Sequence, residues 1–187
     1  MTAAAPSLPE KVVAIHRALA GARVGHAFGG AIALAYYAEP RATIDVDVNL
    51  FVAPERHGAV AAAVGPLGVD PGPDSSATAL IRDGQARWWW DETPVDLFFA
   101  YDPIHDAMAD AIRRVPFGRA GERIPILAPE HLIACKVAFD RPKDWLDVEQ
   151  MLFLADGLDP AAAREWIVRV TGPGDPRVRR FDDLAAV

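Results

Sequence analysis

The segment that most constrains the fold is the stretch 43–52, in which polar and apolar residues alternate strictly from Thr43 to Leu50. A period of two is typical of a β-strand with one buried face, because successive side chains point to opposite sides of a strand. The apolar side carries Ile44, Val46, Val48 and Leu50, and the polar side carries Thr43, Asp45, Asp47 and Asn49. We therefore expect a half-buried strand whose polar face presents two aspartates close together.

These two aspartates suggest a cation site. Carboxylates this close repel each other unless a cation neutralises them. Oxygen-only ligands suit Mg²⁺, which binds through one or two carboxylates, water and substrate phosphates. Asp45 and Asp47 are therefore candidate magnesium ligands. A polar strand face that simply meets solvent is the alternative, and this pattern alone leaves it open.

A pair of glycines precedes this strand. Residues 24–28 have the pattern of a short strand, Gly29-Gly30 ends it, and an alanine-rich helix is expected from Ala31 to about Ala38. Glycine lets the backbone approach a ligand closely, and a helix N-terminus offers free N–H groups to an anion. A plain tight turn is the alternative. The order of glycines, helix and acidic strand nevertheless predicts a phosphate cradle beside a metal site.

The rest of the chain alternates helices and strands and ends in helices. Ser7 and Glu10 have capping-box spacing, which predicts a first helix from Pro9 to Ala20, and Asp83-Gly84 suggests a hairpin turn. We expect an α+β fold, a mixed sheet flanked by helices, with an α/β core at 1–127 and a helical C-terminal portion at 128–187. The other expected elements are helices at 54–64, 103–114, 129–139, 142–155 and 160–170, strands at 77–82, 85–90, 93–101 and 123–127, and a short tail.

Composition narrows the function classes. A length of 187 residues suits about one domain, and a formal charge of −7 argues against nonspecific nucleic-acid binding, which depends on Lys and Arg. The single cysteine, Cys135, excludes an internal disulfide and a thiolate metal cluster. No apolar run approaches the roughly 18 residues of a membrane span, and the N-terminal segment lacks signal-peptide features. We expect a cytoplasmic protein with no membrane partner.

The combined motifs resemble the nucleotidyltransferase superfold. Its members carry an apolar residue followed by Gly-Gly or Gly-Ser, then an acidic strand of form h-D-h-D/E-h, then a third carboxylate between apolar residues on a later strand. The matching segments here are Phe28-Gly29-Gly30, Ile44-Asp45-Val46-Asp47-Val48 and Val95-Asp96-Leu97. Gly30 stands where other members have Ser, so a hydroxyl contact to phosphate is missing.

Within the superfold, the chain looks most like the AbiEii-type branch of minimal nucleotidyltransferase toxins. The acidic strand of that branch reads R-x-T/S-x-D-x-D, which matches Arg41 to Asp47. A later helix there carries a lysine followed by a basic-Asp turn, which matches Lys136 and the segment Arg141 to Asp147.

The resemblance implies that a nucleoside monophosphate is transferred from an NTP to a hydroxyl with Mg²⁺, releasing pyrophosphate. Its catalytic carboxylates and metal ligands would be Asp45, Asp47 and Asp96, with Asp96 beside the incoming hydroxyl. The acceptor stays open among transfer RNA, protein and small molecules, and an antitoxin protein is a candidate partner. The nucleotide-binding residues that the resemblance implies are Gly29, Gly30, Arg41, Thr43 and Lys136.

Two other functions fit part of the pattern. A D-x-D phosphatase with an aspartyl nucleophile needs an apolar strand that ends at the first aspartate, whereas here the strand pattern continues past Asp47, with apolar residues as far as Val52. A non-catalytic module that binds a nucleotide or a partner on the same fold is the second alternative, and the presence of all three carboxylates argues against it.

Some conspicuous residues fit packing better than chemistry. His26 and Cys135 lie in apolar segments, and we expect a hydrogen-bonded core histidine at 26 and a packing residue rather than a nucleophile at 135. Asp144 and Asp147 are expected to pair with nearby basic residues or to sit at a helix N-terminus rather than to bind metal. The run Trp88-Trp89-Trp90 cannot face one way on a strand, so at least one ring should be exposed or line a cleft.

Overall fold

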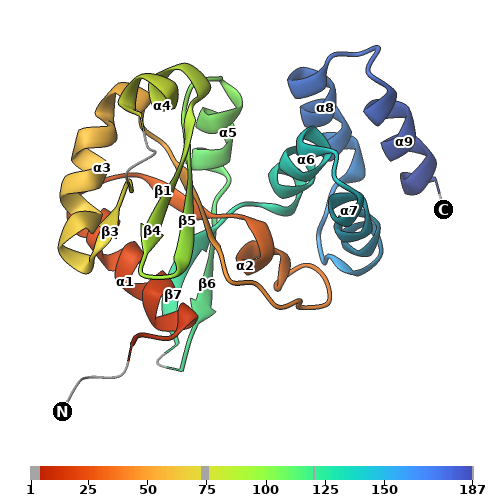
Figure 1. The fold of residues 1–187 in the computed structure, drawn as a ribbon. Helices are drawn as coiled ribbons and strands as arrows, with labels where there is room; N and C mark the ends of the chain where they lie inside the picture. Colours follow the sequence, from red (N-terminus) through yellow and green to blue (C-terminus); the bar gives the residue numbers. More distant parts are fainter. Residues whose placement is uncertain (1–4, 73–75, 120, 187) are drawn as a thin grey trace. The chain divides into compact units, whose positions relative to one another are not determined.

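The computed structural model describes residues 5–72, 76–119 and 121–186, which fall into two units (Figure 1). Unit 1 consists of Met1–Phe28 and Thr43–Ile126, and unit 2 consists of Gly29–Ala42 and Leu127–Val187. The segment 29–42 therefore groups with the C-terminal helices, whereas the sequence pattern assigned it to a core spanning 1–127.

Unit 1 is built on a seven-stranded mixed sheet with strand order β3-β4-β5-β2-β1-β7-β6. The pairs β2–β5 and β1–β7 are parallel, and the other four neighbouring pairs are antiparallel. This arrangement confirms the predicted α+β class. The strands are β1 (His26–Phe28), β2 (Val46–Leu50), β3 (Val69–Asp70), β4 (Gln85–Trp90), β5 (Thr93–Phe99), β6 (Arg113–Phe117) and β7 (Glu122–Ile126).

One face of the central strands forms the core of unit 1. The alternating side chains of β2, β4 and β5 are almost fully buried on this face: Val46, Val48, Leu50, Trp88, Trp90, Val95, Leu97 and Phe99. Helix α1 (Leu8–Gly21) lies on the same side, because the ammonium of its Lys11 donates to the Trp90 carbonyl at 2.8 Å and sits 5.3 Å from the Trp90 ring centroid. The remaining helical segments of unit 1 are η1 (Pro54–Arg56), α3 (His57–Val64), η2 (Gly65–Leu67), α4 (Ala77–Asp83) and α5 (Ile104–Asp110).

The N-terminal helix follows the predicted capping signal. Ser7 caps α1, its backbone N–H donates to the Glu10 carboxylate at 2.7 Å, and the helix ends at Gly21. The helix predicted from Pro54 to Val64 also forms, with a 3₁₀ first turn.

The hairpin predicted at Asp83-Gly84 is wrong. Residues 77–83 form helix α4, which Ser76 caps at the N-terminus, accepting from the Ala79 N–H at 3.4 Å. Gly84 ends the helix in a left-handed conformation, with φ of +66° and its N–H on the Leu80 carbonyl. The same Asp-Gly pair suits a helix C-cap as well as a turn. The hairpin instead joins β4 to β5, with Trp90 paired to Thr93.

Two further predictions need correction. The helix predicted over 103–114 stops at Asp110, and the residues after it form β6, which pairs with β7. The predicted short tail contains helix α9 (Pro176–Ala185), whose N-cap Asp175 accepts from the Arg177 N–H at 2.9 Å. Strand β6 pairs with the next strand along the chain, and a single local capping residue marks the start of α9.

Unit 2 is helical (Figure 1). Helix α6 (Pro129–Phe139) packs against α7 (Pro142–Leu154) and α8 (Pro160–Thr171), and α9 packs against α7 and α8. The short helix α2 (Gly30–Leu34) belongs to this unit and contacts α6. Within the described part of the chain, none of the helices has the length and hydropathy needed to cross a membrane.

Candidate active site

Asp47 and Asp96 lie side by side on the sheet. They are paired residues of the parallel strands β2 and β5, so their Cα atoms are separated by about one strand spacing, roughly 4.8 Å. Their chain neighbours Val46, Val48 and Val95 are buried on the core face, and alternation therefore sends both carboxylates out of the opposite face. The pairing depends on a strand register that sequence spacing alone does not specify.

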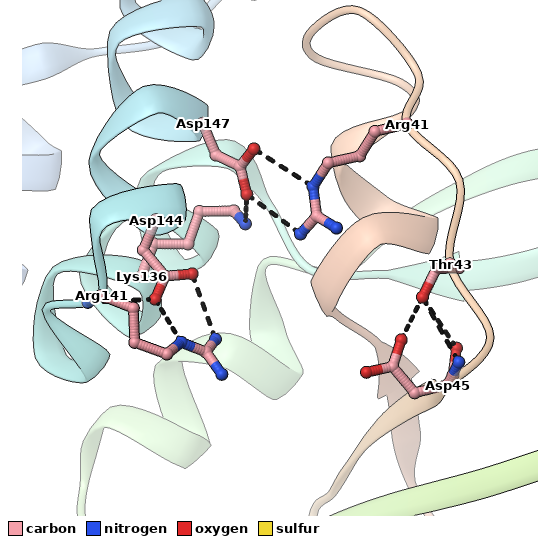
Figure 2. Close-up of polar contacts among 7 residues, drawn as sticks. All are labelled: Arg41, Thr43, Asp45, Lys136, Arg141, Asp144 and Asp147. Carbon is pink, nitrogen blue, oxygen red and sulfur yellow. Dashed lines mark hydrogen bonds and ion pairs between the residues drawn. The ribbon is translucent and has the colours of Figure 1, made fainter.

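Asp45 lies one residue ahead of β2, where a turn rather than strand pairing orients it. The Asp45 N–H donates to the Thr43 hydroxyl oxygen at 3.4 Å, and the Thr43 hydroxyl also donates to the Asp45 carboxylate (Figure 2). The strand predicted over 43–52 spans only Val46–Leu50. Ile44, predicted on its apolar side, is 77% exposed because it precedes the strand. Thr43, predicted to bind nucleotide, thus has Asp45 as its partner in the structure.

Arg87 faces the carboxylates from the other side of Asp96. It is paired with Asp96 across the antiparallel strands β4 and β5, and its Nε and Nη2 each donate to one Asp96 oxygen at 2.7 Å. These hydrogen bonds raise the pKa of Arg87, and the negative charges of Asp96, Asp45 and Asp47 add to the increase. The row Asp47, Asp96, Arg87 therefore runs across three strands.

Sequence reasoning missed Arg87 because it placed a hairpin at Asp83-Gly84 and did not pair 85–90 with 93–101. Only Asp91-Glu92 separates these two segments, and a two-residue turn there pairs Arg87 with Asp96. The caps at Ser76 and Gly84, spaced for a short helix between them, were the signal that would have moved the turn to Asp91-Glu92.

The carboxylates fit a magnesium ion by their chemistry, since all donors are hard oxygens. Among the described residues, however, no group of three or more His, Cys, Asp or Glu side chains is arranged to hold a metal ion. The bidentate pair with Arg87 engages both oxygens of Asp96. A metal ion at Asp96 would therefore have to share these oxygens with the Arg87 guanidinium or displace it.

Gly29 and Gly30 belong to unit 2 and begin helix α2. Gly30 has φ of +50°, a conformation that favours glycine, and Gly29 precedes it as the N-cap residue. The helix ends at Leu34, short of the predicted Ala38, so the aligned backbone dipoles are few. The phosphate cradle stays a prediction that rests on the sequence order and on this backbone conformation.

Lys136 and Arg41 meet at Asp147 within unit 2 (Figure 2). The buried Lys136 ammonium lies 2.6 Å from an Asp147 oxygen, and the Arg41 Nη2 lies 3.2 Å from the same atom. Asp144 pairs with Arg141, with 2.6 Å between Arg141 Nε and an Asp144 oxygen. Asp144 and Asp147 are thus confirmed as partners of basic residues. The nucleotide-binding roles of Lys136 and Arg41 stay predictions.

His26 and the three consecutive tryptophans behave as expected. His26 is buried, its Nδ1 lies 2.8 Å from the Val24 carbonyl, and its Nε2 lies 2.9 Å from His16 Nδ1. Burial lowers the pKa of His26 to about 4, which identifies it as a neutral interior histidine. Of the three consecutive tryptophans, Trp88 and Trp90 are buried and Trp89 is 41% exposed, as alternation on a strand requires.

Comparison with known proteins places the fold. No protein-family model matches the chain, and no curated protein matches it. Solved structures show that the chain has the nucleotidyltransferase fold. The solution structure of the antibiotic-resistance factor ANT(2'')-Ia has a TM-score of 0.62 at 16% identity, covering 95% of both chains.

A crystal structure of ANT(2'')-Ia in complex with adenylyl-2''-tobramycin is also similar, with a TM-score of 0.51 at 16% identity over 94% of this chain and 92% of that one. The resemblance is to the nucleotidyltransferase fold as a whole. Assignment to the AbiEii-type branch stays a prediction from the motifs.

Proposed function

We propose that this protein is a magnesium-dependent nucleotidyltransferase, which transfers a nucleoside monophosphate from an NTP to a hydroxyl acceptor. The observation that carries the proposal is the pairing of Asp47 with Asp96 on parallel strands, with Asp45 held by Thr43 two residues before Asp47. Two carboxylates side by side on a sheet, with a third two residues from one of them, have a function if a divalent cation joins them.

The proposed transfer assigns a role to each of these residues. The acceptor oxygen forms a bond to the α-phosphorus, the bond from that phosphorus to its bridging oxygen breaks, and pyrophosphate leaves. Asp45 and Asp47 would hold the metal with the triphosphate, and Asp96 would orient the acceptor hydroxyl and accept its proton. The bound metal would supply electrostatic stabilisation of the attacking and leaving oxygens. Gly29, Gly30 and Lys136 are proposed to contact the phosphates.

A small molecule is the acceptor class we favour. The chain covers almost the whole length of ANT(2'')-Ia, which was solved in complex with adenylyl-2''-tobramycin. The formal charge of −7 disfavours a nucleic-acid acceptor held by phosphate neutralisation. Transfer RNA and protein acceptors, and an antitoxin partner as in toxin-like members, form the rival version of the proposal.

Radiolabel transfer tests the proposal directly. Each α-³²P-labelled NTP is incubated with Mg²⁺ and with aminoglycosides, total tRNA or protein, and label on the acceptor is measured. Label on aminoglycoside supports the small-molecule version, whereas label on tRNA or protein supports the toxin-like one. NTP binding with no transfer to any acceptor and no hydrolysis would indicate the non-catalytic module instead.

Replacement of Asp96 separates binding from chemistry. Asp96→Asn should keep most of the Mg²⁺-dependent NTP affinity, because Asp45 and Asp47 remain. It should lose transfer by about 10²–10⁴-fold, the usual contribution of general-base assistance. Calorimetry and the transfer assay measure the two effects. Asp47→Asn is the control, which should abolish the metal dependence of NTP binding. Full transfer by Asp96→Asn would remove Asp96 from the mechanism.

A further inference from the structure

We propose that Arg87 is a built-in counter-ion that holds Asp96 in the metal-free protein and competes with the metal for this carboxylate. The inference rests on the proposed metal site and adds a residue that the motifs do not contain. It assigns to Arg87 a positioning role: through Asp96 it would set how readily the carboxylate cluster takes up a cation.

The geometry of the pair supports this role. Two donors of one guanidinium satisfy both Asp96 oxygens at 2.7 Å, which is the strongest form of Arg–carboxylate contact. Arg87 and Asp96 are register partners on neighbouring strands, so the backbone holds them opposite each other. Strand pairing therefore places the two side chains next to each other.

The same geometry allows Arg87 to release the Asp96 carboxylate. Its side chain is 54% exposed, whereas the side chain of Asp96 is 16% exposed, so the guanidinium can swing into solvent without opening the core. The next residue along β4, Trp88, is buried and holds the strand in place while the arginine moves. Loss of the pair thus changes the charge at the site without changing the sheet.

The positive charge of Arg87 competes with a metal ion for the Asp96 carboxylate. Asp45, Asp47 and Asp96 all act on the charge of Arg87, so the guanidinium already neutralises part of the cluster. A divalent cation bound at Asp96 would meet this positive charge at close range and would have to displace it. Triphosphate brings compensating negative charge. We therefore expect weak metal binding to the free protein and much stronger binding when nucleotide is present.

The test measures Mn²⁺ binding to the full chain without nucleotide, by electron paramagnetic resonance of the free ion at low salt. Arg87→Met keeps the length and apolar stem of the side chain but removes its charge. It should bind Mn²⁺ about tenfold more tightly than the wild type, because a neighbouring positive charge is gone. In the Asp96→Asn background the same change should give a clearly smaller gain, since the contested carboxylate is absent and only the weaker charge effect on Asp45 and Asp47 remains.

Arg82→Met is the matched control. Arg82 also makes a bidentate pair, with Asp83 at 2.6 and 2.7 Å, but its partner is not one of the three candidate ligands. Its loss should leave Mn²⁺ affinity unchanged. Arg87→Lys is the second variant, needed if Arg87→Met does not unfold cooperatively in urea. Lysine cannot bind both oxygens as a fork, so this variant should show a smaller gain of about threefold.

The outcomes separate the inference from the proposed function. If the wild type binds Mn²⁺ through Asp47 but Arg87→Met or Arg87→Lys binds it no better, Arg87 does not compete and the inference fails while the metal site stands. If an equal gain appears with Asp96→Asn, Arg87 acts elsewhere and the inference also fails. If neither the wild type nor the variants bind Mn²⁺, with or without NTP, the proposed metal site is wrong and the inference falls with it.

Discussion

In unit 2, the Asp147 carboxylate pairs with two positively charged side chains. Its carboxylate meets the buried Lys136 ammonium at 2.6 Å and the Arg41 guanidinium at 3.2 Å. Breaking a buried ion pair leaves a charge without compensation, which usually costs more than the intact pair contributes. Lys136 therefore matters for stability, whatever it does for a nucleotide.

We expect Lys136→Met to lower the free energy of unfolding by about 3 kcal/mol, because Asp147 then keeps only the more exposed Arg41 as a partner. Urea unfolding measures the change. Lys143→Met is the control, since Lys143 is exposed on α7 and should change stability by less than about 0.5 kcal/mol. Equal effects of the two substitutions would contradict the structural role of Lys136.

The nucleotide role of Lys136 has a separate signature. If its ammonium also contacts phosphate, Lys136→Ala weakens binding of the triphosphate much more than binding of the bare nucleoside, by about 1–3 kcal/mol. Calorimetry with the two ligands, on protein shown to be folded, gives the comparison. The same loss for both ligands would assign Lys136 to structure alone.

His26 makes stability depend on pH. The folded chain holds His26 neutral down to about pH 4, whereas an unfolded histidine takes up a proton near pH 6.5. The unfolded state therefore binds more protons between these values, and stability falls as the pH is lowered. The contribution is complete above pH 6.5, and about 3 kcal/mol of it is lost by pH 4.

Urea unfolding from pH 7 to pH 4 should thus show a shallower fall for His26→Gln than for the wild type. His57→Gln is the control, because His57 is only half-buried and bonds to the Pro54 carbonyl of its own turn. An unchanged pH dependence in His26→Gln would show that His26 is not the group that takes up the proton.

At the scale of elements, helix α4 depends on its C-cap. Gly84 has φ of +66°, and a Cβ there would lie 2.3 Å from the Tyr101 ring. Gly84→Ala should therefore cost the roughly 1 kcal/mol of a left-handed alanine and a further penalty for moving the ring. Thermal or urea unfolding measures the total.

Gly157 provides the matched comparison, since it has φ of +68° but nothing within 4 Å of an added Cβ. Gly157→Ala should cost only the backbone term. Tyr101 is 70% exposed, so the double variant Gly84→Ala/Tyr101→Ala should recover the difference. If Gly84→Ala is no worse than Gly157→Ala, the Tyr101 contact has no energetic weight.

At the scale of the whole molecule, the division into units predicts the behaviour of fragments. The buried residues Ile32 and Leu34 of α2 group with the C-terminal helices, and the Tyr37 hydroxyl donates to the Leu127 carbonyl at 2.8 Å. A fragment of residues 1–127 keeps Leu127 but lacks α6, which α2 contacts, so its segment 29–42 should lose packing partners. Hydrogen exchange should show fast exchange of the α2 amides in the fragment and protection in the full chain. Protection of α2 in both would favour a core that ends at residue 127.

The sequence by itself determined the elements whose signals are local. The capping box at Ser7 and Glu10, the alternation that buries Val46, Val48 and Leu50, and the helices that begin at Pro129, Pro142 and Pro160 were all predictable. Capping and periodicity operate over a few neighbouring residues, so a single chain segment contains the whole signal. The motif order from Gly29 to Asp96 also predicted the nucleotidyltransferase fold.

Tertiary structure decided which strands pair and what surrounds the acidic residues. Asp-Gly at 83–84 suits both a hairpin and a helix C-cap, and only the packing of Leu80 and the pairing of β4 with β5 select the second. The register of β4 against β5 places Arg87 opposite Asp96, in a contact that the sequence motifs do not contain. The burial of Lys136 against Asp147 likewise depends on how α6 and α7 pack. Register and packing join residues far apart in sequence, and the energies that select them belong to the assembled fold and not to a local segment.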